Sequence, residues 1–474
     1  MRRTTLATAL LLTAALAAPQ LDARPAKAPK LASHPQAEAQ TLDLSKRLIA
    51  LRSVEGPGNQ TPQALGVVKD ALVAGGWSAD TVEITPFRDT AYLIATWPGS
   101  DPSLKPLVIS GHMDVVEANP KDWTRDPFTP VIEDGILYGR GASDMKFDAA
   151  LATSSLIELR RQGYRPKRTI ILQFSGDEET TMRSSRVIAE RLKNAELVIN
   201  IDGGGGTFEE GTAKPLYWTW QGAEKTYDDY QIEVTNAGGH SSAPRPANAI
   251  VQLSQALAKV GAYHFQPELS PLTKAYFEKA AAFEKDPKLS AAMRVFAANP
   301  NDEVAAATLR ASPTYVGKIG TTCTPTMVTA GHAQNALPQR AKANVNCRIF
   351  PGHSREEVRT VLEQVIGMPD VKVTATSGED SIAAPASPMR PDFIAAAEKA
   401  MQLVHPGISV FPSQASGATD SAWYRALGVP SYGASPTFSM DSEDFSHGLN
   451  ERVRLSNIMP GVNYYLSLFT DLSK

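Results

Sequence analysis

Three short and nearly continuous apolar runs limit the fold of this chain more than any other feature. They are PLVIS at 106–110, TIILQF at 169–174 and ELVINI at 196–201. Uninterrupted runs of this length are typical of strands that are buried on both faces of a sheet. Between the first two runs, apolar residues recur at helical spacing from residue 144 and stop at Gly163. The pattern predicts a parallel α/β sheet with crossover helices.

A different pattern occupies the middle of the chain. YDDYQIEVTNA at 227–237 alternates polar and apolar residues, and further strand-like and helix-like segments follow it up to residue 376. Their order, β, α, β, β, α, β, predicts a ferredoxin-like α+β layer with one solvated sheet face. An Ala- and Lys-rich stretch at 264–312 interrupts this order, and we expect additional helix there. After residue 385 the α/β pattern returns.

These patterns predict a three-layer α/β catalytic domain made of residues 40–222 and 386–474. An α+β lid or dimerisation domain would be inserted at residues 223–385. At 474 residues and 42% hydrophobic content, the chain is long enough to bury more than one core. Its net charge of -3 offers no basic surface, so we expect no nucleic-acid partner.

The N-terminus has the features of an export signal. Arg2 and Arg3 precede an apolar stretch from Leu6 to Leu16, and the small residues ALAA follow. This stretch is shorter than the roughly 20 residues that a membrane-spanning helix needs. The length disfavours the alternative of a retained membrane anchor. We therefore expect residues 1–18 to be a cleaved signal peptide, residues 19–39 a flexible leader, and the mature protein periplasmic.

The two cysteines matter because export leads to an oxidising compartment. Cys323 and Cys347 lie in two strand-like segments at equal distances from Asn335. Residues equidistant from a turn face each other across a hairpin, and a disulfide is therefore compatible with the sequence. Two buried thiols on one face fit equally well, so both interpretations stay open.

Polar residues follow each predicted buried strand, where open α/β sheets form their sites. His112 and Asp114 alternate after the first strand, which suits a metal-binding His and a carboxylate that orients it. Asp144 opens the crossover helix and could be a helix cap or a ligand. Asp202 precedes four glycines and could be a turn residue or a ligand. A phosphate loop is disfavoured because no Lys follows these glycines.

Two adjacent carboxylates, Glu178 and Glu179, follow the second strand. Consecutive side chains diverge, so one carboxylate could bind a metal while its neighbour takes a proton from an activated water. A solvated acidic loop is the alternative interpretation. His240 lies in a Gly/Ser turn and is a candidate donor to substrate, and His447 lies in a loop before the last helix and is a candidate ligand.

Together these residues resemble the aminoacylase/carboxypeptidase family of di-zinc metallohydrolases. The motifs that carry the resemblance run in order from about residue 40 to the C-terminus: GHMDVV, GRGASDMK, DEE, NIDGGG, GGHSSAP, TPTMVTAGHAQNALP, NCRIFPG, SGATDSAWY and HGLNE. Their shared order and spacing are more specific than any single motif. Two of these motifs, TPTMVTAGHAQNALP and NCRIFPG, are most similar to the carboxypeptidase S branch.

The resemblance implies a zinc-peptidase-like catalytic domain with two zinc ions. His112 and Asp202 would bind one zinc, and Glu179 and His447 would bind the second. Asp144 would bridge the two ions. Cobalt or manganese would suit the same mixture of His and carboxylate ligands.

The resemblance also assigns the catalytic and substrate-binding residues. Glu178 would be the general base for a hydroxide that bridges the metals, and Asp114 would orient the first metal-binding histidine. His240 would help polarise the scissile carbonyl, in dimeric relatives often from the partner subunit. The residues that would hold the carboxylate end of the substrate are Arg348, Asn335, Gly417 and Thr419.

These residues imply an exported metallo-carboxypeptidase, dipeptidase or N-acyl amino acid amidohydrolase. The substrate would be a small peptide or an N-acyl amino acid with a free carboxylate, and a homodimer could form through the lid. The alternative is a catalytically silent ligand-binding protein on the same scaffold. The sequence leaves open the preferred side chain or acyl group, the native metal, the oligomeric state and the purpose of residues 264–312.

Overall fold

A large mixed sheet forms the centre of the protein. The computed structural model describes residues 31–443 and 445–474. Within them the sheet runs in the order β1-β2-β6-β3-β7-β17-β9-β8-β18, with β16 paired to β9. Its strands are β1 (Val82–Phe87), β2 (Thr90–Trp97), β3 (Leu107–His112), β6 (Ile170–Ser175), β7 (Leu197–Asn200), β8 (Gly205–Phe208), β9 (Pro215–Glu224), β16 (Ser409–Ala415), β17 (Ser431–Gly433) and β18 (Phe438–Ser439).

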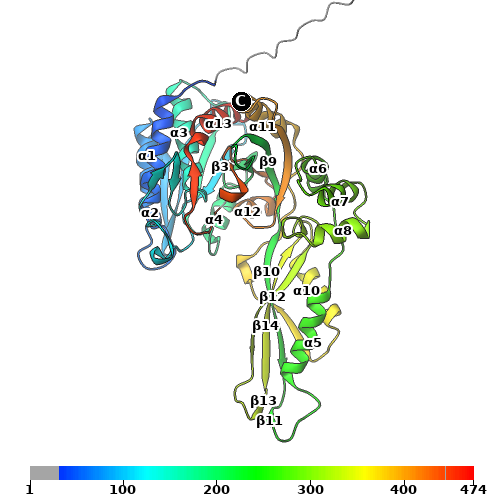
Figure 1. The fold of residues 1–474 in the computed structure, drawn as a ribbon. Coiled ribbons are helices and arrows are strands. Elements are labelled where there is room, and N and C mark those ends of the chain that lie inside the picture. Colours follow the sequence, from blue (N-terminus) through cyan, green and yellow to red (C-terminus); the bar gives the residue numbers. More distant parts are fainter. Residues whose placement is uncertain (1–30, 444) are drawn as a thin grey trace, which may run out of the picture. The chain divides into compact units, whose positions relative to one another are not determined.

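The three apolar runs form β3, β6 and β7 as predicted, and β3 pairs in parallel with both of the others. Their side chains alternate between two cores: Leu107 and Ile109 belong to one, and Val108 to the other. The helices that supply the first core are α1 (Pro35–Ile49), α2 (Thr61–Ala74), α3 (Lys146–Arg161), α11 (Pro391–Val404) and α13 (Ile458–Leu472). α4 (Arg183–Arg191) and α12 (Ser421–Ala426) supply the second. Helices therefore cover both faces, giving three layers (Figure 1).

The predicted lid is a second sheet, in the order β12-β14-β10-β15 and antiparallel throughout. Its elements are β10 (Thr226–Thr235), α5 (Ala249–Ala262), β12 (Thr322–Ala330), β14 (Arg340–Ile349), α10 (Arg355–Ile366) and β15 (Val371–Ala375). They follow the β, α, β, β, α, β order predicted from the sequence. One sheet face packs on α5 and α10 around Tyr230, Ile232 and Val234. A short ladder of β11 (Gly239–His240) and β13 (Ala336–Leu337) adjoins this layer.

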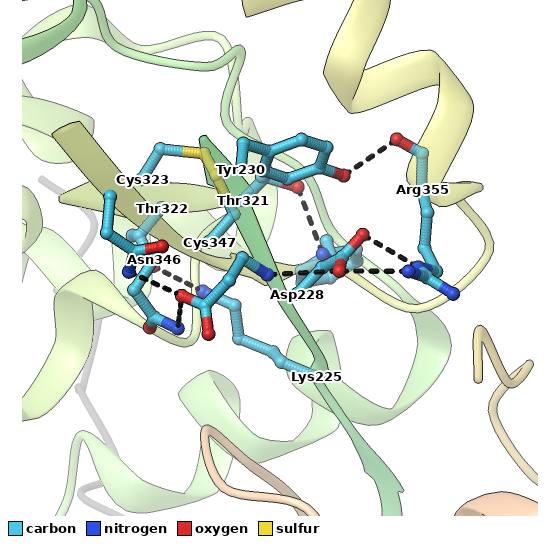
Figure 2. The surroundings of a disulfide bond; sticks show 12 residues. Lys225, Asp228, Tyr230, Thr321, Thr322, Cys323, Asn346, Cys347 and Arg355 are labelled. Atoms are coloured by element: carbon cyan, nitrogen blue, oxygen red, sulfur yellow. Dashed lines mark hydrogen bonds and ion pairs between the residues drawn. A yellow bond between two sulfur atoms is a disulfide. The ribbon is translucent and has the colours of Figure 1, made fainter. Parts of the chain in front are cut away.

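A disulfide joins two strands of the lid. Cys323 on β12 faces Cys347 on β14 in the register predicted from their equal distance to Asn335, and their sulfur atoms are 1.98 Å apart. Figure 2 shows the bond and its surroundings. The structure thus selects the disulfide over two buried thiols.

The residues at 264–312 are helical, as predicted, but their packing differs from the prediction of a lid elaboration. They form α6 (Pro271–Ala280), α7 (Pro287–Ala298) and α8 (Glu303–Arg310), and α9 (Pro313–Val316) follows. Phe277 and Phe296 share a core with Phe411 of β16, against which Tyr217 of β9 packs. These helices are therefore buried against the central sheet. Apolar spacing alone identifies a helix without identifying the surface that it covers.

The first described helix begins earlier than predicted. The predicted signal peptide and most of the leader lie outside the described residues. The leader was expected to reach residue 39, yet α1 begins at Pro35, and Ala37 is already buried. Proline favours the first helical turn because it needs no amide partner there.

Three further features complete the fold. A small sheet of β4 (Val131–Glu133), β5 (Ile136–Tyr138) and β19 (Arg452–Arg454) pairs two distant segments. Residues 31–474 form one unit by their contacts, and the domain boundaries at residues 222 and 385 stay predictions. Among the described residues, none of the helices is both long and apolar enough to cross a membrane.

Candidate functional site

The carboxyl ends of three adjacent strands bring the candidate residues together. β6, β3 and β7 are neighbours, and His112 at the end of β3 lies level with Ser175 at the end of β6. Glu178 and Glu179 follow β6, and Asp202 follows β7. Because parallel strands end at the same edge of a sheet, side chains that were far apart in the sequence meet there.

His112 is buried among acidic groups. Its Nε2 lies 3.1 Å from an Asp144 carboxylate oxygen and 3.7 Å from one of Asp202. Its Nδ1 lies 3.0 Å from the backbone carbonyl of Asp114. Burial opposes charging of the ring, but the carboxylates of Asp202, Asp114 and Asp144 raise its pKa well above the usual value. The site thus has a negative potential that favours a cation.

Asp144 lies between two histidines. One carboxylate oxygen contacts His112, and the other lies 3.2 Å from Nε2 of His447. The residue comes immediately before Met145 at the start of α3. A carboxylate that offers one oxygen to each histidine has the arrangement of a ligand that bridges two ions. This geometry favours the ligand over the helix cap, because both oxygens of Asp144 face histidines and the N-cap position of α3 is occupied by Met145.

The two adjacent glutamates differ in their contacts. Glu179 places one oxygen 2.9 Å from Nε2 of His447, while its other oxygen is buried and has no hydrogen-bond partner in the described part of the chain. Glu178 is also buried, and burial together with neighbouring carboxylates raises its pKa well above the usual value. A raised pKa suits a carboxylate that must take and release a proton near neutral pH.

Asp114 has a different contact from the one the resemblance implies. Its carboxylate accepts the backbone N–H groups of Glu178 at 3.1 Å and Glu179 at 2.9 Å. The same carboxylate lies 3.6 Å from Nδ1 of His112, beyond a good hydrogen bond. The backbone carbonyl therefore orients the histidine, while the side chain fixes the loop that carries both glutamates.

The donor set fits divalent metal ions. Donor atoms of His112, Asp144 and Glu179 lie within 4.8 Å of one another. In the described part of the chain, the carboxylates around the two histidines form no ion pair with Lys or Arg. Several buried carboxylates without a cation repel one another, and metal ions would neutralise them. Imidazole and carboxylate ligands suit zinc, cobalt and manganese.

A cavity of about 460 Å³ opens beside this cluster. Arg348, Gly417 and Thr419 line it together with Glu178 and Glu179. The Arg348 guanidinium lies 4.7 Å from the centre of the Tyr227 ring and forms no ion pair among the described residues. The cavity therefore places an unpaired guanidinium near the metal-binding groups, as a substrate carboxylate would require.

Two of the predicted site residues, His240 and Asn335, lie away from this cavity. Tyr227 pairs with Arg348 at one end of the lid sheet, and Thr235 pairs with Arg340 at the other. The eight residue steps from one pair to the other span about 26 Å of extended strand. His240 lies beyond Thr235, where it pairs with Ala336.

Asn335 lies beside His240, since its carbonyl accepts the N–H of Ser241 at 3.0 Å. In Figure 1, β11 and β13 accordingly lie at the end of the lid sheet away from α12. Neither residue lines the cavity that Arg348 lines. Within one copy of the chain, the structure therefore does not bring them to the candidate site, and their roles stay predictions.

Glu451 holds the backbone of the loop that carries Asp144, although the sequence indicated no role for it. Its side chain is fully buried and forms a 2.6 Å ion pair with Arg140. It also accepts the backbone N–H groups of Gly141, Ser143 and Asp144 at 2.7–3.0 Å. One buried carboxylate thus holds the loop that carries Asp144. The HGLNE and GRGASDMK motifs contain these residues, but only the fold shows that they meet.

Replacing Glu451 by glutamine is expected to weaken metal binding by about 10- to 100-fold, because groups that position a ligand typically contribute that much. The substitution keeps the shape but removes the charge that pairs with Arg140. Metal affinity would be measured by competition with a chromophoric chelator. Glu443→Gln is the matched control, because Glu443 pairs with Arg454 instead. Equal affinities in both variants would contradict this role.

Comparisons with known proteins agree with this geometry. Residues 108–471 match the family model described as peptidase family M20/M25/M40. The chain is 28% identical to "Probable carboxypeptidase S-like 2" of Dictyostelium discoideum over 400 residues, covering 81% of this chain and 74% of the relative. It is 26% identical to the human N-fatty-acyl-amino acid synthase/hydrolase PM20D1, with coverages of 79% and 75%.

A solved structure supports the fold in the same way. The M20 family metallo-carboxypeptidase Sso-CP2 from Sulfolobus solfataricus superposes with a TM-score of 0.69 at 17% sequence identity. The superposition covers 91% of this chain and 98% of that one. The predicted fold class, an α/β catalytic domain with an inserted α+β lid, is thereby confirmed.

Proposed function

The chain belongs to peptidase family M20/M25/M40, and from this premise we propose that it is an exported hydrolase with two divalent metal ions. Its substrate would be a peptide or N-acyl amino acid whose scissile amide lies next to a free carboxylate. Membership of the family confirms the resemblance found in the motifs. The names of the relatives, a carboxypeptidase and an N-fatty-acyl amino acid hydrolase, support both substrate types.

The position of Asp144 between His112 and His447 is the observation that carries the proposal. A carboxylate with one oxygen toward each histidine matches two neighbouring ions, one on each side. Asp202 lies on the His112 side and Glu179 on the His447 side. In the proposed arrangement each ion has its own histidine and its own carboxylate, and Asp144 is shared by the two. Zinc is the proposed metal, and cobalt or manganese would satisfy the same donors.

The residues around the cluster supply the rest of the chemistry. Two bound cations would polarise the scissile carbonyl and lower the pKa of the attacking water. Glu178 takes the proton from that water on its carboxylate and delivers it to the leaving nitrogen. Asp114 fixes Glu178 through the backbone, so the base needs little reorganisation. Arg348 and the loop at Gly417 hold the carboxylate of the substrate in the cavity.

A substrate panel tests this function. The protein would be stripped with a chelator, reloaded with zinc, cobalt or manganese, and assayed on dipeptides, N-acyl amino acids and their C-terminal amides. We expect metal-dependent release of an amino acid from substrates with a free carboxylate, and poor turnover of the amides. Absence of turnover across the panel with two metals bound would contradict the proposal.

We also propose a homodimer in which the lid of one copy completes the site of the other. The length of the lid sheet separates His240 from Arg348, so both can contact one substrate only if they come from different copies. A C2 dimer would supply each site with the partner's histidine.

Subunit mixing tests this arrangement. His240→Ala and Glu178→Ala chains, each inactive alone, are expected to recover about a quarter of wild-type activity when mixed one to one and reassociated. Half of the dimers would be mixed, and one of their two sites would contain both intact residues. Activity would be measured after separate and joint refolding. If His240 acted within its own chain, the mixture would stay inactive.

Export is proposed from the N-terminal pattern at residues 1–18. The Cys323–Cys347 bond supports it, because disulfides persist in oxidising compartments such as the periplasm. N-terminal sequencing of protein from the periplasmic fraction tests the cleavage site. A start near residue 19 is expected, and an uncleaved cytoplasmic protein would contradict the proposal.

A further inference from the structure

The hydroxyl of Thr419 has all of its hydrogen bonds inside the protein. The residue is buried in the loop that lines the candidate substrate cavity, and its hydroxyl donates to a carboxylate oxygen of Glu224 at 2.8 Å. The same hydroxyl oxygen accepts the side-chain amide of Asn200 at 3.1 Å and the backbone N–H of Ser421 at 3.2 Å. A hydroxyl has one donor and two acceptor positions. No position is left for a substrate carboxylate.

Asn200 connects this hydroxyl to a proposed metal ligand. It is the last residue of β7, it is buried, and its side-chain oxygen accepts the backbone N–H of Asp202 at 2.8 Å. Its amide nitrogen donates to Thr419 and, at 2.9 Å, to the hydroxyl of Ser421. A side-chain amide has two N–H donors, and both are used here. The orientation of the amide is therefore fixed from the Thr419 side, and the amide in turn fixes the backbone of Asp202.

Glu224 anchors the other end of this series of contacts. It is the last residue of β9, and Thr226 begins β10 of the lid. Its carboxylate forms a 2.7 Å ion pair with Arg425, and both side chains are buried. Gln221 donates to the same carboxylate oxygen as Thr419, at 3.1 Å. Because breaking a buried ion pair is strongly unfavourable, Glu224 is a firmly held acceptor for the Thr419 hydroxyl.

The chain that follows Asp202 offers it little support. Residues 203–206 are all glycine, and Gly204 and Gly205 have positive φ angles of 72° and 126°. Glycine populates a wide range of backbone conformations and has no side chain that could contact a neighbour. No side chain of this segment can therefore hold Asp202 from the downstream direction. The side-chain support comes from the β7 side, where Asn200 lies.

We propose that Thr419 positions Asp202 through Asn200, and that the Thr419 hydroxyl does not bind the substrate. The inference rests on the proposed function and replaces the substrate-binding role that the motif resemblance implies for Thr419. Arg348 and Gly417 remain the proposed contacts of the substrate carboxylate. A residue that lines the cavity would thereby support a metal ligand.

Thr419→Val tests the positioning role, because it keeps the shape of the side chain and removes the hydroxyl. We expect the affinity for the ion proposed at His112 and Asp202 to fall about 10- to 100-fold, the usual loss when a group that orients a ligand is removed. Zinc affinity would be measured without substrate, by competition with a chromophoric chelator. The Glu179→Ala background, which should retain only this ion, isolates its affinity. An affinity equal to that of the parent would overturn the proposal.

Two further variants show whether the hydroxyl itself is responsible. Thr419→Ser keeps the hydroxyl and should retain the zinc affinity of the parent. Thr226→Val is the matched control, because Thr226 is a buried threonine that lines the same cavity and, in the described part of the chain, makes no hydrogen bond to Asn200 or Asp202. It should also leave the affinity unchanged. Equal losses in Thr419→Val and Thr226→Val would overturn the proposal.

A double-variant cycle tests whether Thr419 acts through Asn200. Asn200→Ala removes the acceptor of the Asp202 N–H directly. If the two residues work in series, the variant with both changes should lose no more zinc affinity than the more affected single variant. Losses that simply add would contradict a path through Asn200.

Kinetics at saturating zinc separate positioning from direct contact with the substrate. The KM of Thr419→Val for N-acetyl-L-methionine is expected to stay within a few-fold of the wild type, because the proposed carboxylate contacts are intact. Loss of a hydrogen bond to the substrate carboxylate would instead raise KM by about tenfold or more. Such a rise, persisting at saturating zinc, would overturn the proposal.

Hydrogen exchange separates this inference from the proposed function. Peptides that contain Asp202 would be followed by mass spectrometry in metal-free protein, where neither zinc binding nor turnover affects the result. We expect the Asp202 N–H to exchange about tenfold faster in Thr419→Val and at the wild-type rate in Thr419→Ser, because the hydrogen bond to Asn200 opens more often. If the wild-type protein bound no metal, the proposed function would fail, while faster exchange would still support the link. Equal exchange in Thr419→Val and the wild type would overturn it.

Discussion

Glu178→Ala is expected to lower kcat by about 100- to 10,000-fold while the metal content stays that of the wild type, because the variant loses only its general base. Glu178 is buried beside the metal-binding groups, and in the described part of the chain the carboxylates that pair with His112 and His447 are those of other residues. The measurement pairs steady-state kinetics with elemental analysis of the same sample. KM should change little, since Arg348, the proposed carboxylate anchor, is intact.

Glu178→Gln provides the matched comparison for shape. It keeps the size of the side chain and the backbone bond to Asp114, but it cannot accept the proton. A similar loss of kcat in both variants would identify proton transfer as the missing step. Loss of metal from either variant, or activity within a few-fold of the wild type, would contradict the role of Glu178.

Glu179→Ala has the second large expected effect, on metal binding. Glu179 contacts His447 at 2.9 Å and has a second oxygen that is buried without a partner. Its removal leaves His447 and the bridging Asp144 to hold the second ion, too few protein ligands for a stable site. We expect the metal content to fall from two ions per chain to about one. Elemental analysis after gel filtration in metal-free buffer would measure it.

The adjacent Glu178→Ala variant is the control for this loss, since both substitutions remove one buried carboxylate from the same loop. Activity of Glu179→Ala should recover partly when the assay contains excess zinc. Glu178→Ala should not respond to added metal. If both variants kept two ions, or if both lost one, the division of roles between the two glutamates would be wrong.

The sequence predicted the parts of the fold that depend on local periodicity. The apolar runs at β3, β6 and β7 have the length typical of buried strands, and the segment at β10 has the alternation typical of a half-buried strand. Strand ends then indicated where His112, the two glutamates and Asp202 would meet, because parallel strands end at one edge. The structure brings all of them together with His447.

Features that depend on distant partners were not predictable. Glu451 contacts residues that precede it by more than 300 positions, and nothing local marks such a contact. The carboxylate of Asp114 lies beside His112 as expected, but its hydrogen bonds to the backbone of the glutamate loop were not indicated by the sequence. Side-chain partners across a fold are set by packing, which a single sequence does not show.

Counting the metal ions bound by the wild-type protein tests the central claim most directly. The purified protein would be equilibrated with zinc, passed through a desalting column, and analysed for metal and protein in the same fractions. The arrangement of Asp144 between His112 and His447 predicts about two zinc ions per chain. A protein that retains no stoichiometric divalent metal would contradict it, and the catalytically silent binding protein would then be the better account.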